Sequence, residues 1–152
     1  MNIIPALSLH LATIQSTILD ECDRSLADTD LRGVQLFYLL TVCQNAGVSQ
    51  DRLAALLGVA NSNVTRQIST LERLGYVTRR RDANDGRRCL VDPTDRAYEM
   101  LPRLVEILRD AQAALTRNMS LEEQELLLEL VERISYNAAR HKASGHRDDD
   151  RV

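Results

Sequence analysis

QDRLAALLGVANSNVTRQISTLERL, residues 50–74, is the stretch of sequence that decides the fold. Ser49 stands where the N-cap of a short helix is expected, and Gly58 stands where that helix would end. After a short turn, a second amphipathic helix is predicted over residues 61–74. The expected inward positions are Leu53, Leu56 and Leu57 in the first helix and Val64, Ile68 and Leu71 in the second. Two such helices joined by a turn predict a helix-turn-helix.

The outward face of the second helix carries amides, hydroxyls and one arginine. A solvated helix face usually carries pairs of glutamate and lysine, whereas these groups are the ones that hydrogen-bond base edges and phosphates. We therefore predict that this face, called the recognition face below, binds DNA. Its residues are Asn61, Ser62, Asn63, Thr65, Arg66, Gln67 and Ser69.

A basic hairpin, called the wing below, is predicted over residues 76–91, with strands at 76–81 and 89–91. Residues 61–91 contain seven arginines against three acidic residues, in a chain whose net charge is −3. Arginines at a hairpin tip can enter the negative minor groove. In this interpretation Asp85 holds a nearby arginine, either Arg87 or Arg66. The predicted wing residues are Arg79, Arg81, Asp85, Arg87 and Arg88.

Apolar stripes at helical spacing flank this region on both sides. Residues 3–24 and 94–140 predict helices whose stripes suit a dimer interface, and Ser120 begins a capping box for the last of them. The predicted fold class is mainly α with a small β-hairpin wing, as a winged helix-turn-helix lobe at 31–93 plus these dimerisation helices. Together residues 1–140 would form one domain, and residues 141–152 are predicted to be a disordered tail.

A family resemblance is carried by LAALLGVANSNVTRQISTLERLGYV at 53–77, RRD at 80–82, DGR at 85–87 and LV at 90–91. Together these stretches resemble the MarR family. The resemblance implies a homodimer that binds a pseudo-palindromic double-stranded operator, and usually represses until a small ligand or oxidation releases it. It makes Arg87 the minor-groove arginine and assigns base-reading positions to Ser62, Asn63, Thr65 and Arg66. Ala60, where the family often has Asp or Ser, leaves the cap of the recognition helix to Asn61.

Two kinds of regulatory site are predicted. A small-molecule effector would bind between the DNA-binding lobe and the dimerisation helices, at residues His10, Ile14, Phe37, Tyr38, Thr41 and Tyr98. A redox-sensing regulator is the alternative, with Cys89 as its first candidate, because cationic neighbours make a thiol reactive, and Cys22 as its second.

Other classes of protein have little support. No apolar run approaches the roughly 20 residues that span a bilayer, and no signal peptide is evident. Widely spaced cysteines suit a cytoplasmic location. The three histidines form no metal-ligand pattern, no cofactor motif is present, and no catalytic motif predicts an enzyme. A winged-helix protein-interaction module without DNA binding is the remaining alternative, because the fold also serves as a scaffold.

Overall fold

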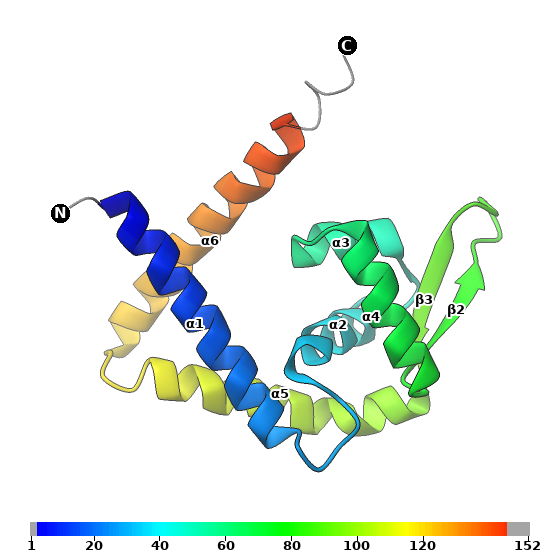
Figure 1. Ribbon diagram of the computed structural model, residues 1–152, viewed down its shortest axis with the longest axis horizontal. Helices are drawn as coiled ribbons and strands as arrows, with labels where there is room; N and C mark the ends of the chain where they lie inside the picture. The colour runs from blue at the N-terminus through cyan, green and yellow to red at the C-terminus, as the bar shows by residue number, and fades with distance from the viewer. Residues whose placement is uncertain (1–2, 146–152) are drawn as a thin grey trace. The chain divides into compact units, whose positions relative to one another are not determined.

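A computed structural model describes residues 3–145 of the chain (Figure 1). The described residues fall into two compact units, one ending at Ala113 and the other beginning at Ala114. The elements, in chain order, are α1 (Ile3–Ser25), α2 (Gly33–Gln44), β1 (Val48–Ser49), α3 (Gln50–Leu57), α4 (Asn61–Arg73), β2 (Val77–Arg81), β3 (Cys89–Pro93), α5 (Asp95–Leu115) and α6 (Leu121–Gly145). The predicted fold class is confirmed: the chain is mainly helical, with a small β-sheet wing.

The helix-turn-helix forms as its local signals predict. Ser49 caps α3 by accepting a hydrogen bond from the backbone N–H of Arg52, at 3.2 Å. Gly58 ends α3 with a φ of +66°, a left-handed conformation that glycine adopts without strain. Val64, Ile68 and Leu71, the inward positions of α4, are fully buried.

The wing belongs to a three-stranded antiparallel sheet rather than to a hairpin alone. Its order is β1-β3-β2, with Val48 opposite Val91 and Val77 opposite Pro93. The sequence did not predict β1, because two residues are too few to show the alternation of a strand. Through β1 the sheet joins the start of α3 directly to the wing.

The core of the first unit lies where α2, α4 and the sheet meet. Leu36, Leu39 and Val42 of α2 are fully buried, whereas Val34 on the same helix is 38% exposed. In α3 the expected Leu56 is likewise 43% exposed. Leu56 differs from the prediction because a helix period shows which residues share a face, but not how completely neighbouring elements cover that face.

A polar cluster ties the turn after α4 to the start of α5. The Tyr76 hydroxyl donates to Asp30 at 2.9 Å, and Arg96 donates to the same carboxylate at 2.9 Å while lying 4.4 Å from the Tyr76 ring centroid. Thr94, which precedes α5, donates through Oγ1 to the carbonyls of Gly75 and Tyr76, at 2.7 and 3.1 Å.

The second unit is dominated by α6. Its predicted capping box is confirmed, because Ser120 Oγ accepts from the N–H of Glu123 at 3.2 Å and Glu123 accepts from the N–H of Ser120 at 2.7 Å. The helix continues to Gly145, so residues 141–145 are helical and the prediction of a tail starting at 141 is wrong there. Lys142 and Ala143 both have high helix propensity, which favours continuation of the helix. Residues 146–152 of the predicted tail lie outside the described residues.

Within residues 3–145, the structure contains no helix long and apolar enough to cross a membrane.

Candidate nucleic-acid interface

The recognition face lies on the outer surface of α4. Six of its seven residues are exposed and Gln67 is half-buried, since Val64, Ile68 and Leu71 take the opposite side of the helix. Arg66 donates to the Asn63 side chain at 3.0 Å, so these two neighbours are already oriented by each other. The structure therefore brings the predicted residues together on one accessible face.

The N-terminus of α4 has no side-chain cap. Ala60 occupies the N-cap position, and no side-chain hydrogen bond closes it. The expectation that Asn61 takes over the cap is wrong, because Asn61 lies inside the first turn and donates to Asp51 at 3.1 Å. A helix end without a side-chain cap leaves its first backbone N–H groups for other acceptors, and it favours anions.

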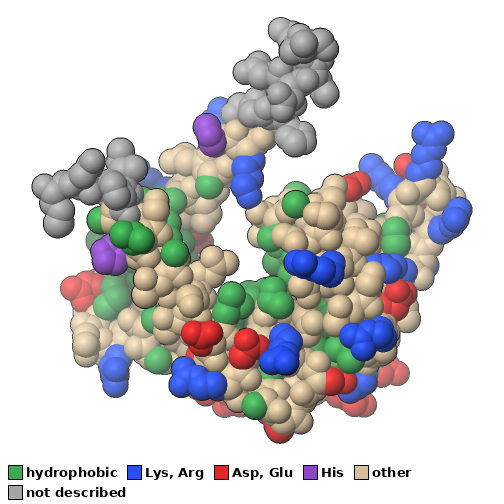
Figure 2. All heavy atoms as spheres, in the orientation of Figure 1, with side chains coloured by type: hydrophobic (Ala, Val, Ile, Leu, Met, Phe, Trp, Pro, Cys, Tyr) green, Lys and Arg blue, Asp and Glu red, His purple; other side chains and the backbone are tan. Residues whose placement is uncertain are grey.

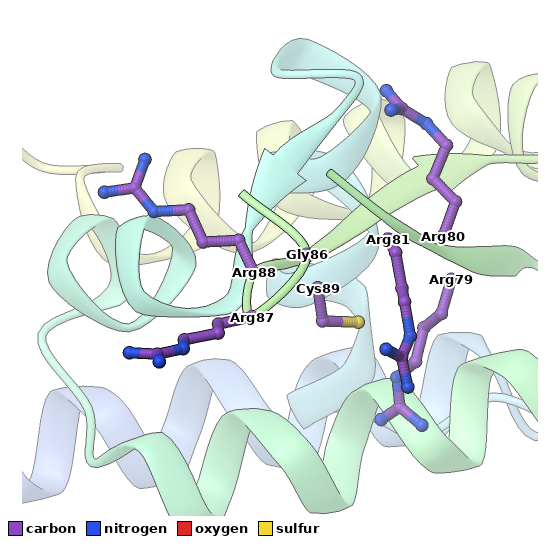
Figure 3. Close-up of a pocket in the computed structure, with 7 residues that line it drawn as sticks. All are labelled: Arg79, Arg80, Arg81, Gly86, Arg87, Arg88 and Cys89. Atoms are coloured by element: carbon purple, nitrogen blue, oxygen red, sulfur yellow. The ribbon is translucent and has the colours of Figure 1, made fainter. Parts of the chain in front are cut away.

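Five arginines line a hollow of about 610 Å³ in the wing (Figure 3). Strand alternation sends Arg79 and Arg81 to one side of β2 and Arg80 to the other, as Figure 3 shows. Arg80 pairs with Asp92 on β3 at 2.6 Å. Figure 2 shows basic side chains standing out around the wing at the upper right of the view.

The wing tip is held by Asp85, but not in the way predicted from the sequence. Asp85 accepts from the backbone N–H of Arg87 at 3.1 Å, and its other oxygen lies 3.6 Å from Nε of Arg88. The predicted side-chain pairing with Arg87 or Arg66 is thus replaced by pairing with Arg88, because the tight turn brings residues three apart together. Arg87 itself is exposed at the tip.

Arg79 differs from the other wing arginines. Its guanidinium donates to α4 at three points: the Thr65 carbonyl at 3.1 Å, the Ser69 hydroxyl at 2.9 Å and the Glu72 carboxylate at 3.1 Å. Two predicted DNA contacts, Arg79 and Ser69, therefore bond to each other in the free protein.

An apolar groove of about 580 Å³ lies within the first unit, between α1, α2 and α4. Of the predicted effector residues it brings together Ile14, Phe37 and Tyr38, and polar residues of α4, including Arg66, complete its wall. Burial raises the pKa of the Tyr38 hydroxyl, and the nearby charge of Arg66 partly offsets the rise.

Three of the predicted effector residues do not line this groove. His10 is exposed on α1, and Tyr98 is 47% exposed on α5. Thr41 turns its hydroxyl back to the Phe37 carbonyl within its own helix, at 2.8 Å. A helical stripe read from sequence could not show which of these side chains share a cavity.

The two candidate redox cysteines lie in different surroundings. Cys22 is fully buried, and burial, followed by the charges of Asp23 and Glu21, raises the pKa of its thiol. A raised pKa reduces the thiolate fraction that oxidants attack. Cys89 is half-buried in the arginine-lined hollow of the wing.

Comparisons with known proteins agree with this architecture. The family model described as MarR family matches residues 29–88, which include α2, α3, α4, β2 and the turn of the wing. A crystal structure of MarR is 25% identical, with a TM-score of 0.81, and the match covers 91% of this chain and 94% of that one. A MarR protein from Peptoclostridium difficile is also 25% identical, with a TM-score of 0.79 and coverage of 93% and 90%.

A third structure adds a nucleic acid to the comparison. It is a MarR-family transcriptional regulator from Listeria monocytogenes complexed with 26mer DNA, and it shares the fold at 18% identity, with a TM-score of 0.82 and coverage of 97% and 95%. The resemblance seen in the sequence is confirmed by the match at residues 29–88 and by structures that align over nine-tenths of the chain. Residues 29–88 of this chain therefore match the MarR family, and the chain shares its fold with solved MarR structures.

Proposed function

We propose that the chain is a homodimeric regulator that binds a pseudo-palindromic site in double-stranded DNA and represses transcription until a small-molecule effector releases it. The observation that carries this proposal is the position of the exposed recognition face of α4 beside an arginine-lined wing. The Listeria relative with the same fold was crystallised with DNA, which supports the proposal by analogy.

Each part of the surface has a distinct task in this proposal. The recognition face enters the major groove, where Asn63 and Arg66 read base edges. The uncapped N-terminus of α4 binds a phosphate. Arg87 reaches the minor groove, while Arg81 and Arg88 neutralise phosphates beside it.

The test is a fluorescence-anisotropy titration of the full chain against duplexes from the region upstream of its own gene, at several salt concentrations. We expect tight binding to one duplex and weak binding to its scrambled counterpart, because base contacts add to phosphate contacts. The logarithm of the affinity should fall linearly with the logarithm of salt, with a slope of roughly −0.9 per phosphate contacted. Equal, weak binding to every duplex tested would refute sequence-specific recognition.

The dimer is supported by the second unit, taken by itself. Leu127, Leu130, Val131 and Ile134 form a stripe along α6, and each is between 41% and 43% exposed. A stripe of this length in contact with water is costly, at about 25 cal/mol per Å² of apolar surface. A second copy of the chain would cover it.

We expect Leu130→Ala to raise the dimer dissociation constant by about tenfold, because the lost side chain no longer buries its apolar surface at the interface. Analytical ultracentrifugation over a concentration series measures this constant. Glu129→Ala is the matched control on the opposite side of α6, and it should leave the constant unchanged. If neither substitution changes the dimer dissociation constant, the interface does not include this stripe of α6.

The apolar groove of the first unit is the proposed effector site. A ligand there would contact Ile14 and Phe37 on one side and Arg66 of the recognition face on the other. Such a ligand can release DNA only if it binds the DNA-free conformation more tightly than the DNA-bound one. Arg66 could produce this difference in ligand affinity, because the ligand and DNA would both contact its side chain.

A further inference from the structure

Arg79 occupies an unusual place in the wing, on the core side of the sheet. Its strand neighbour on the same face is Val77, which is buried, and its cross-strand partner is Val91, which is fully buried. The alternation of strand residues therefore directs the Arg79 side chain inward, toward α4, rather than outward with Arg80.

The three acceptors of Arg79 lie along one line of α4. Thr65, Ser69 and Glu72 follow one another at spacings of four and three residues, so they share one face over two turns of the helix. One arginine can donate hydrogen bonds to all three acceptors because its guanidinium presents several donors in a planar fork, whereas a lysine ammonium is a single point charge.

Solvent exposure separates Arg79 from the arginines that are available for phosphate. The Arg79 side chain is 24% exposed, against 55% for Arg80 and 62% for Arg88. Its Nε atom is buried and has no hydrogen-bond partner among the described residues. To contact a phosphate, this guanidinium would have to leave all three of its acceptors on α4.

We propose that Arg79 is a positioning residue: it clamps the recognition helix to the wing, and it sets the angle at which α4 meets DNA without touching DNA itself. This inference rests on the proposed function for its consequence, but the clamp exists in the free protein. The clamp also neutralises Glu72, whose carboxylate would otherwise stand unpaired and repel the phosphate backbone.

The first experiment measures the clamp without DNA. Amide hydrogen exchange is followed in the full chain and in Arg79→Ala, over peptides covering residues 65–73 and 50–57. Exchange in residues 65–73 should become about tenfold faster in the variant, since one side of α4 loses its anchor, while residues 50–57 should be unaffected. Unchanged exchange in residues 65–73 would overturn the proposal.

The second experiment separates positioning from phosphate contact by the salt dependence of operator binding. Arg79→Ala should weaken binding by about tenfold with an unchanged salt slope, and Arg79→Lys should be equally weak. Arg81→Ala, the matched control on the same strand, should reduce the slope by about one per subunit. The clamp is refuted if Arg79→Ala lowers the slope as Arg81→Ala does, or if lysine restores wild-type affinity.

Glu72→Gln provides a test in which the two explanations predict opposite signs. Removing an acidic charge near DNA should tighten binding if only net charge matters. If Glu72 anchors the clamp, the same change should weaken binding in the wild-type chain, whereas in the Arg79→Ala background, where the clamp is already lost, it should not weaken binding further. A wild-type chain that prefers no duplex would refute the proposed function alone, because the exchange experiment still decides whether the clamp exists.

Discussion

Arg87→Ala should weaken operator binding by roughly a hundredfold while the chain remains folded and dimeric. In the proposed dimer each half-site would lose on the order of 1–2 kcal/mol, and the losses at the two half-sites combine. The reason is the exposed position of Arg87 at the wing tip, where its backbone N–H is fixed by Asp85 and its side chain extends into solvent. Fluorescence anisotropy against the operator duplex measures the change.

Arg109→Ala is the matched control for that experiment. Arg109 is an exposed arginine on α5, outside the recognition face and the wing, so its loss removes the same charge without removing a predicted contact. Operator affinity should be unchanged in this variant. A similar loss of affinity in both variants would mean that overall charge, and not the wing tip, governs binding.

Ile68→Ala should lower the free energy of unfolding by about 2–5 kcal/mol, the range for removing a large aliphatic side chain from a packed core. Ile68 is fully buried on the inner side of α4, between the recognition face and the core of the first unit. A loss of this size is a large fraction of the stability of a typical domain. Chemical denaturation followed by circular dichroism measures it.

Leu56→Ala provides the control for burial. Leu56 is also an aliphatic residue of the helix-turn-helix, but it is 43% exposed, so its truncation should change the unfolding free energy by only about 0.5 kcal/mol. The comparison also tests the structure against the sequence, because helical spacing alone placed Leu56 inward. A loss at Leu56 as large as that at Ile68 would contradict the burial described above.

The features that the sequence predicted correctly depend on local interactions. The inward residues of α4 follow from the helical period, the Ser49 cap from its position before α3, and the Ser120–Glu123 capping box from a spacing of three residues. Each of these signals is contained within a few turns of chain. The excess of arginine in residues 61–91 likewise predicts the wing, because most of these arginines are close together in sequence.

The features that the sequence missed depend on contacts between distant segments. The sequence predicts Arg79 as a DNA-binding residue of the wing, but it does not show that α4 lies against the Arg79 side chain. The hydrogen bond from Thr94 to the Gly75 carbonyl joins residues 19 apart in sequence, so only the fold brings them together. The membership of the groove was equally unpredictable, because it depends on how α1 and α4 face each other around α2.

The pairing of β1 with β3 has a consequence for how the chain is made. Synthesis proceeds from the N-terminus, so β1, α3 and α4 are all produced before the residues of β3 exist. Val48 cannot pair with Val91 until the wing has emerged from the ribosome. Arg79 is synthesised only shortly before Val91. The helix-turn-helix is therefore synthesised early, but its contacts with the wing form only after the wing has been synthesised. An interrupted translation product that ends before the wing would contain the recognition helix, but it would lack the wing contacts that orient this helix.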